Sequence, residues 1–264
     1  ARLRQRIPAT RPAAWPERRH ARHMVILEGC VQPALAPSIN AAAARVMDRL
    51  GISLVRVGGE RCCGALNHHL GRTGAALAEV RHNVRLLTAA LDAGAEAIIS
   101  TTSGCGVMVK DYAHLLRGEP AVATAAARVA GATRDVCEII EPSMLESLAA
   151  QSEDVAVKVA WQAPCTLQHG QKITGRVEAL LTAAGYRLTP VSQPHLCCGS
   201  AGTYSILQPE LAQELRRRKL ETLLEGQPDL IATANIGCLE HLRVASGIPV
   251  LHWIELVDQR LAPA

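Results

Sequence analysis

The sequence has almost no aromatic side chains: it has no Phe, three Trp and three Tyr among 264 residues. Proteins that hold single-stranded nucleic acids stack bases on aromatic rings, so this composition argues against single-stranded nucleic-acid binding. Hydrophobic residues nevertheless make up 48% of the chain and charged residues 20%, as in ordinary globular proteins. We therefore expect cores built from Ala, Leu, Val and Ile.

Two further absences concern membranes and export. No apolar run reaches the roughly 20 residues that a transmembrane helix needs, and the N-terminal segment lacks the apolar centre of a signal peptide. We expect a cytoplasmic protein, with peripheral association at the inner face of the cell membrane left open. Disulfides are disfavoured in a reducing compartment, and nine cysteines are an odd number for a disulfide framework. Metal ligation explains most of them better.

Positive charge is concentrated at the start of the chain. Residues 1–23 contain seven Arg, one Glu and three Pro, which leaves a net charge of +6 in a chain whose total is +4. We interpret this segment as an extended linker. An arm that binds nucleic acid or a membrane surface is the alternative interpretation.

The cysteines form two sets of four in the same order: single, adjacent pair, single. The pair is followed by Gly both times, and the single cysteine before it stands 32 positions upstream in both sets (62 − 30 and 197 − 165). The last cysteine follows 42 and 40 positions after the pair (105 − 63 and 238 − 198). Such self-similarity predicts a duplicated domain, with one copy in residues 24–150 and the other in 151–264. The sets are Cys30, Cys62, Cys63 and Cys105, and Cys165, Cys197, Cys198 and Cys238.

Short apolar runs alternate with longer amphipathic stretches in both halves, which predicts α/β domains with small, mostly parallel sheets flanked by helices. The cysteines follow the strands, and sites in open α/β sheets form beyond the carboxyl ends of strands. We therefore expect the sulfurs of each set to converge. Strands are predicted at 24–27, 52–57, 96–100, 155–161, 187–191, 230–232 and 250–251, and helices at 38–50, 73–93, 121–130, 173–184 and 209–225.

The predicted helix over residues 209–225 places Leu211, Leu215 and Leu223 on one face. The basic run 216–219 lies mostly on the opposite face, where we interpret it as solvated; a docking patch is the alternative. The ninth cysteine, Cys137, lies in an apolar stretch and is predicted to be a core residue.

Four thiolates can bind a tetrahedral zinc ion or a cubane iron–sulfur cluster. Neither half has the paired Cys-x-x-Cys hairpins of structural zinc sites, so widely separated ligands favour a [4Fe-4S] cluster, with zinc as the alternative. Backbone N–H groups in the glycine-containing loops can point at sulfur. The candidates for that role are Gly64 in the first loop and Gly199, Ser200 and Gly202 in the second. Three histidines near the cysteines, His68, His69 and His169, are interpreted as surface residues rather than ligands.

Several short sequence motifs resemble those of the cysteine-rich CCG domain. This domain occurs in heterodisulfide reductases, lactate-utilisation iron–sulfur proteins and glycolate oxidase iron–sulfur subunits. Residues 27–34, 68–71, 102–106 and 197–209 are most similar to the glycolate oxidase family. The resemblance, which covers residues 24–260, implies an electron-transfer subunit. Such a subunit takes electrons from flavin-containing glycolate oxidase subunits and passes them toward a quinone. A lactate-utilisation subunit and a zinc-stabilised scaffold without redox activity are the alternatives.

The chain departs from these families in two respects. The full CCG pattern ends each half in Cys-x-x-Cys, whereas Thr102 and Asn235 stand here at the first of those positions. This departure favours four-thiolate sites over a five-thiolate cluster. Glycolate oxidase subunits also carry two ferredoxin-type motifs at the N-terminus, which this chain lacks. The lactate-utilisation alternative, which has no such region, fits the length of the chain better.

Overall fold

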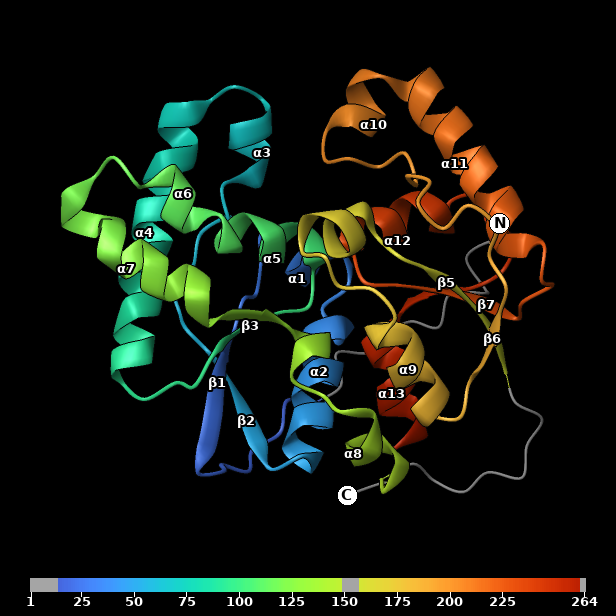
Figure 1. The fold of residues 1–264 in the computed structure, drawn as a ribbon, viewed down its shortest axis with the longest axis horizontal. Helices are drawn as coiled ribbons and strands as arrows, with labels where there is room; N and C mark the ends of the chain where they lie inside the picture. Colours follow the sequence, from blue (N-terminus) through green and yellow to red (C-terminus); the bar gives the residue numbers. More distant parts are fainter. Residues whose placement is uncertain (1–13, 149–156, 262–264) are drawn as a thin grey trace. The chain divides into compact units, whose positions relative to one another are not determined.

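The computed structural model describes residues 14–148 and 157–261, which form two compact units of similar design (Figure 1). The N-terminal unit runs from Trp15 to Ile139, and the C-terminal unit begins at Ile140. The predicted boundary between residues 150 and 151 lies outside the described residues. Each unit contains one of the two cysteine sets.

The N-terminal unit is built on a sheet of four parallel strands. The strand order is β2-β1-β3-β4, so the first strand is central rather than at an edge. Val25 of this strand lies opposite Val55 on one side and Ile98 on the other. The strands are β1 (Arg22–Ile26), β2 (Ile52–Arg56), β3 (Ile98–Ser100) and β4 (Thr133–Asp135).

The C-terminal unit repeats this sheet with the same connectivity. Its order is β6-β5-β7-β8, and all of its strand pairs are parallel. In both units the chain leaves the central strand first toward one edge and then toward the other. Such a reversal creates a switch point, where open α/β sheets bind their ligands. The strands are β5 (Lys158–Gln162), β6 (Arg187–Thr189), β7 (Leu230–Thr233) and β8 (Val250–His252).

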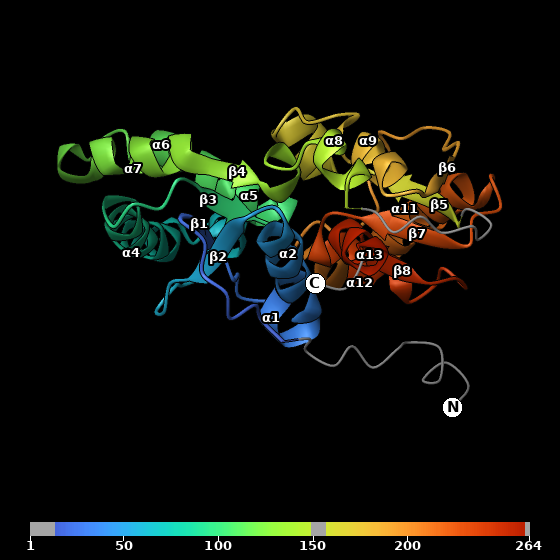
Figure 2. The same ribbon diagram turned by 90° about the horizontal axis from the view of Figure 1, so that it is seen from below.

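The helices of the N-terminal unit bury an aliphatic stripe, as the composition predicts. Val80, Val84 and Leu87 repeat at helical spacing along α4 and are fully or almost fully buried. Figure 2 shows α6 and α7 in one row of this unit, with α4 beside them. The helices are α1 (Gln32–Leu35), α2 (Ser38–Arg49), α3 (Ala65–His69), α4 (Thr73–Asp92), α5 (Ser103–Lys110), α6 (Tyr112–Leu115), α7 (Pro120–Ala132) and the 3₁₀ turn η1 (Val136–Glu138).

The C-terminal unit has helices at the corresponding places but lacks a counterpart of α6 and α7 in the described chain between β7 and β8. In the N-terminal unit these two helices pack against α4 and close the core, where Val129 is fully buried. The C-terminal helices are α8 (Pro142–Glu146), η2 (Thr166–Gly170), α9 (Arg176–Ala183), α10 (Tyr204–Leu207), α11 (Pro209–Leu224), α12 (Ile236–Arg243) and α13 (Trp253–Arg260). None of the helices in the described ranges is both long and apolar enough to cross a bilayer.

The structure corrects the extent of the basic segment. Residues 1–13 lie outside the described residues, but residues 15–23 belong to the N-terminal unit. The Trp15 indole N–H donates to the Leu54 carbonyl at 3.1 Å, and the His20 backbone N–H donates to Ser53 Oγ at 2.8 Å. The sequence-based linker over residues 1–23 is therefore too long, because hydrogen bonds attach its second part to β2.

The buried face of α11 also differs from the sequence prediction. Leu211 is 58% exposed, whereas Ala212, Lys219 and Leu223 are buried. The helix is therefore rotated relative to the predicted leucine face, and one member of the basic run points inward.

Asp135, at the N-cap of η1, is a buried carboxylate with an incomplete set of partners. Its Oδ1 accepts the Cys137 N–H at 3.1 Å, while Oδ2 has no hydrogen-bond partner within the described chain. Burial raises the pKa of Asp135 from 3.8 to about 6. Between these pH values the folded protein holds a proton that the unfolded chain releases, so the group destabilises the fold as pH rises.

Asp135→Asn tests this assignment, because the amide oxygen can still accept from Cys137 and carries no charge. We expect the free energy of unfolding of the wild type to fall, relative to the variant, by about 3 kcal/mol between pH 4 and pH 7, at roughly 1.4 kcal/mol per pKa unit. Denaturant titrations across this range measure the difference. Parallel pH profiles for the two proteins would contradict it.

Candidate metal centres

The four cysteines of the N-terminal unit meet at the carboxyl edge of its sheet. Cys30 follows β1, Cys62 and Cys63 follow β2, and Cys105 lies in the first turn of α5 after β3. Cys30 Sγ is 3.4 Å from Cys62 Sγ, and the Cys63 thiol is hydrogen-bonded to Cys62 and Cys105. The sulfurs form one cluster that is exposed at Cys30 and buried at Cys63.

The second set is arranged in the same way. Cys165 follows β5, Cys197 and Cys198 follow β6, and Cys238 lies in the first turn of α12 after β7. Cys198 Sγ lies 3.0 Å from Cys238 Sγ, and Cys197 is hydrogen-bonded to Cys165 and Cys198. Cys198 and Cys238 are both buried. This set is therefore the more enclosed of the two.

The first cysteine of each adjacent pair has a strongly lowered pKa. The pKa of Cys62 is lowered to about 2 by hydrogen bonds from Cys30 and Cys63, with further contributions from the N–H groups of Gly64 and Leu66. The thiolate is the form that binds metal ions. In the second set, hydrogen bonds from Cys165 and Cys198, and from the Gly199 N–H at 3.3 Å, likewise lower the pKa of Cys197 to about 2.

The remaining thiols with a defined shift are held in the protonated form, because they donate to these thiolates and are partly or wholly desolvated. Hydrogen bonding to Cys62 raises the pKa of Cys30, and hydrogen bonding to Cys105 raises that of Cys63. Cys197 has the same effect on the pKa of Cys165 and of Cys198. Each set is thus a proton-sharing network, from which a bound metal would displace protons.

The glycine after each cysteine pair permits a close approach of the loop to the following helix. Gly64 has φ +92° and Gly199 has φ +89°, in the left-handed region that favours glycine. A Cβ on Gly199 would lie 2.3 Å from the Ala212 carbonyl oxygen on α11. A Cβ on Gly64 would lie 3.2 Å from the Ala76 carbonyl oxygen on α4. The sulfur-bearing loop is therefore placed directly against the helix backbone.

The other loop residues predicted to face the centre contribute unequally. The Ser200 backbone N–H is bonded to Cys198, and Ser200 Oγ packs against Gly237, where a Cβ would come within 2.8 Å. Gly202 has φ +61°. Within the described chain, no hydrogen bond joins Gly202 or the Ser200 hydroxyl to a cysteine sulfur.

Thr102 and Asn235, which stand where the full CCG pattern has an additional cysteine, occupy the N-cap positions of the helices that bear Cys105 and Cys238, and only the Asn235 side chain caps its helix. Asn235 Oδ1 accepts the Gly237 N–H at 2.9 Å, and its Nδ2 donates to Thr166 Oγ1 at 3.3 Å. The Thr102 hydroxyl donates to the Gln32 side chain. Thr102 thus connects the start of α5 to the segment after Cys30. Asn235 connects the start of α12 to the segment after Cys165 in the same way.

The donor sets suit a group that takes four thiolates, but the sulfurs are too close for a metal as they stand. In a tetrahedral zinc site with bonds of about 2.3 Å, neighbouring sulfurs lie about 3.8 Å apart. Here the sulfurs of Cys30 and Cys62 lie 3.4 Å apart, and those of Cys198 and Cys238 lie 3.0 Å apart. Accordingly, no group of three or more His, Cys, Asp or Glu side chains in the described ranges has metal-binding geometry. The side chains must separate to admit either zinc or a larger iron–sulfur cluster.

Residues outside the cysteine sets agree with their predicted roles. Cys137 is the middle residue of η1 and is fully buried in the core of the N-terminal unit. His68, His69 and His169 are exposed, and no hydrogen bond between these rings and a cysteine occurs in the described part of the chain.

Sequence reasoning misses the buried polar residues that support the loops. Asn83 of α4 donates to the Cys62 carbonyl at 3.0 Å, and the Tyr112 hydroxyl donates to the Cys63 carbonyl at 2.9 Å. The Glu60 carboxylate accepts the Glu28 N–H at 2.9 Å and thereby links the Cys30 loop to the Cys62 loop. Burial raises the pKa of Glu60 to about 7. A polar residue on the apolar face of α4 is the one signal that could have identified Asn83.

The fold and sites define a duplicated α/β protein in which each copy gathers four thiols at its switch point. The CCG cysteine-rich domain family matches the chain twice, over residues 24–110 and 159–243, and the chain belongs to this family. These matches confirm the duplicated CCG architecture predicted from the sequence.

Similar proteins include two kinds of bacterial protein. The chain is 45% identical over 261 residues to the glycolate oxidase iron-sulfur subunit of Escherichia coli, covering 98% of this chain and 63% of that protein. It is 26% identical to lactate utilization protein A of Bacillus licheniformis, covering 88% of this chain and 97% of that protein. The corresponding protein of Anoxybacillus flavithermus is 24% identical over 241 residues, with 88% and 97% covered.

Gly199→Ala should disrupt the second centre, because its Cβ would meet a backbone oxygen that cannot move without shifting α11. Gly59→Ala is the matched control, since Gly59 has the same φ of +89° but open space around a Cβ. We expect the control to lose only the left-handed backbone cost of roughly 1–2 kcal/mol and Gly199→Ala to lose more. Thermal and denaturant unfolding would measure both; equal losses would show that the close approach does not matter.

Proposed function

We propose that the chain is an iron–sulfur electron-transfer subunit of a glycolate-oxidising complex. It would accept electrons from flavin-containing partner subunits and pass them toward a quinone. The carrying observation is the convergence of four thiols at the switch point of each unit, in a chain 45% identical to a glycolate oxidase iron-sulfur subunit. The chain spans 63% of that relative, so the substrate and partners of the whole protein belong to this proposal.

The cysteines Cys30, Cys62, Cys63 and Cys105, and Cys165, Cys197, Cys198 and Cys238, would each hold one cluster, most simply of the [4Fe-4S] type. A bound cluster supplies one-electron transfer. The protein would provide thiolates, loop N–H groups from Gly64 and Gly199, and the N-terminal turns of α5 and α12, whose dipoles favour negative charge. Substrate oxidation would take place on the flavin partners. We place the complex in the cytoplasm, at the inner face of the membrane where quinone is reached.

Two alternative functions remain to be weighed against this one. The similarity to lactate utilization protein A extends over 88% of this chain, which supports a related complex that acts on lactate. Four-thiol sets alone would also suit zinc in a scaffold that transfers no electrons. The name of the 45% identical relative favours iron and sulfide over zinc.

Metal analysis of anaerobically purified protein separates the electron carrier from the zinc scaffold. We expect iron and acid-labile sulfide in equal amounts, about four of each per occupied centre for a cubane. Cys198→Ser should lose the iron and sulfide of one centre, because the substitution removes a buried cysteine ligand. Cys137→Ala should retain the full content, since that cysteine is a core residue outside both sets. Two zinc ions per chain without sulfide would overturn the proposed function.

The substrate is tested by reconstituting the chain with its flavin partners and a quinone. Glycolate-dependent quinone reduction, lost in Cys198→Ser, is the expected result. Reduction driven by lactate and not by glycolate would instead establish the lactate-utilisation function. The measurement is the rate of quinone reduction with each acid at equal concentration.

A further inference from the structure

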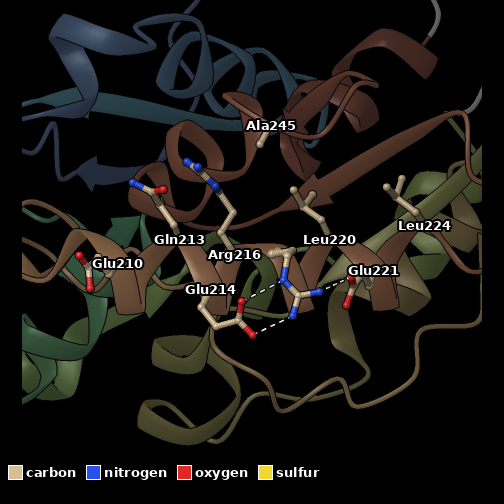
Figure 3. A pocket seen from close by; sticks show the side chains of 9 residues that line it. Glu210, Gln213, Glu214, Arg216, Leu220, Glu221, Leu224 and Ala245 are labelled. Atoms are coloured by element: carbon tan, nitrogen blue, oxygen red, sulfur yellow. Dashed lines mark hydrogen bonds and ion pairs between the residues drawn. The ribbon is translucent and has the colours of Figure 1, made fainter.

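Lys219 differs from the rest of the basic run on α11. Arg217 forms ion pairs with Glu214 and Glu221, and Arg218 pairs with Glu214, all on the outer side of the helix. Figure 3 shows Glu214 and Glu221 on that side of the helix. Arg217 and Arg218 are exposed, as predicted for the run, so the prediction of a solvated face holds for these two residues. Lys219, the next residue, is 0% exposed.

The surroundings of Lys219 contain little to balance a buried positive charge. Its Nζ donates to the Pro194 carbonyl at 3.0 Å, and an ammonium group has three donors. No Asp or Glu in the described part of the chain forms an ion pair with it. Burial of an ammonium without a counter-charge is costly, so this position calls for another source of negative charge.

The four cysteines of the second set are that source. Lys219 interacts electrostatically with Cys165, Cys198, Cys238 and Cys197, which raise the pKa of its ammonium against the larger lowering caused by burial. Without a metal, the Cys197 thiolate supplies one negative charge, and the thiols that donate to it remain neutral. A metal–thiolate centre brings more negative charge to Lys219, because every bound cysteine is then a thiolate.

The first centre has a neutral residue at the corresponding place. Ala76 and Ala212 are equivalent, because each offers its backbone carbonyl to the glycine after the cysteine pair. Seven residues further along each helix stand Asn83 and Lys219. Asn83 is 2% exposed and donates to the Cys62 carbonyl, while Lys219 donates to a carbonyl three residues before Cys197. The two helices therefore place an amide beside one centre and a cation beside the other.

We propose that Lys219 is a positioning residue that supplies a buried positive charge to the second metal–thiolate centre, whereas Asn83 leaves the first centre without one. The proposal rests on the assignment of iron–sulfur centres above. A nearby cation stabilises the reduced form of a cluster, which carries one more negative charge than the oxidised form. The two centres are therefore not equivalent, and the second should have the higher reduction potential.

The test is a redox titration of the whole chain, purified anaerobically and followed by electron paramagnetic resonance. Cys198→Ser first identifies which signal belongs to the second set. In Lys219→Met we expect that signal to become at least tenfold harder to reduce, which is about 59 mV for a one-electron couple. The other signal should not move. Lys219→Arg should keep the wild-type potentials, because it preserves the charge.

Two controls separate the charge of Lys219 from other effects. Arg218→Met removes a cation from the exposed side of the same helix and should leave both potentials unchanged. If Lys219→Met does not hold the second cluster, iron and sulfide content becomes the readout, with Lys219→Gln as a further neutral variant. Loss of that cluster from the neutral variants but not from Lys219→Arg supports the proposal.

The proposal is overturned if Lys219→Met leaves the second potential unchanged, if both potentials shift equally, or if Lys219→Arg behaves like Lys219→Met. The last result would show that shape, rather than charge, matters at this position. These outcomes are distinct from failure of the proposed function. The proposed function fails if the wild-type protein contains no iron and sulfide. The role of Lys219 is judged only from differences between the variants and the wild type.

Discussion

Both candidate centres depend on a close approach between the Cys-Cys-Gly loop and the helix that follows it. The glycine has positive φ in each unit, and its missing Cβ leaves room for a backbone carbonyl of α4 or α11. Because the loop lies against the helix, polar side chains one or two turns further along can reach its backbone. Asn83 and Lys219 do so, and the sulfur geometry therefore depends on helix packing as well as on the sheet.

The sheet supplies the other half of the arrangement. The order β2-β1-β3-β4, repeated as β6-β5-β7-β8, places three cysteine-bearing segments beyond the carboxyl ends of adjacent strands. Cys30 and Cys165 follow the central strands, so each faces the segments on both sides. Cysteines that are tens of residues apart in the sequence therefore have sulfurs 3.4 Å apart in one unit and 3.0 Å apart in the other.

Much of this fold could be predicted because the apolar runs are short and bounded by Gly, Pro or cysteine. The predicted helix at 38–50 corresponds to Ser38–Arg49, and that at 209–225 to Pro209–Leu224. Strand β4 is missed, since three residues containing Arg134 and Asp135 have no apolar pattern. The short helices α5 and α12 are missed because eight residues show too little periodicity.

The candidate centres were only partly accessible from sequence. The repeated spacing identifies the cysteines, because thiols in a fixed order are conspicuous. It does not reveal Lys219, since four consecutive basic residues suggest a solvated face. Ala212, Lys219 and Leu223 are spaced so that they lie on one face of the helix, and this face is buried. The sequence prediction chose a different buried face, because it followed the spacing of the leucines.

The two copies have kept their geometry while diverging in charge. Thr102 and Asn235 occupy the same N-cap position, and each side chain is hydrogen-bonded to the residue after, or second after, the first cysteine of its set. Asn83 and Lys219 occupy equivalent places, yet one is neutral and the other cationic. The positions of the cysteines are fixed by backbone packing that both units share, whereas their electrostatic surroundings depend on single side chains. A duplicated protein can therefore vary the charge beside two matching cysteine sets separately without altering either sheet.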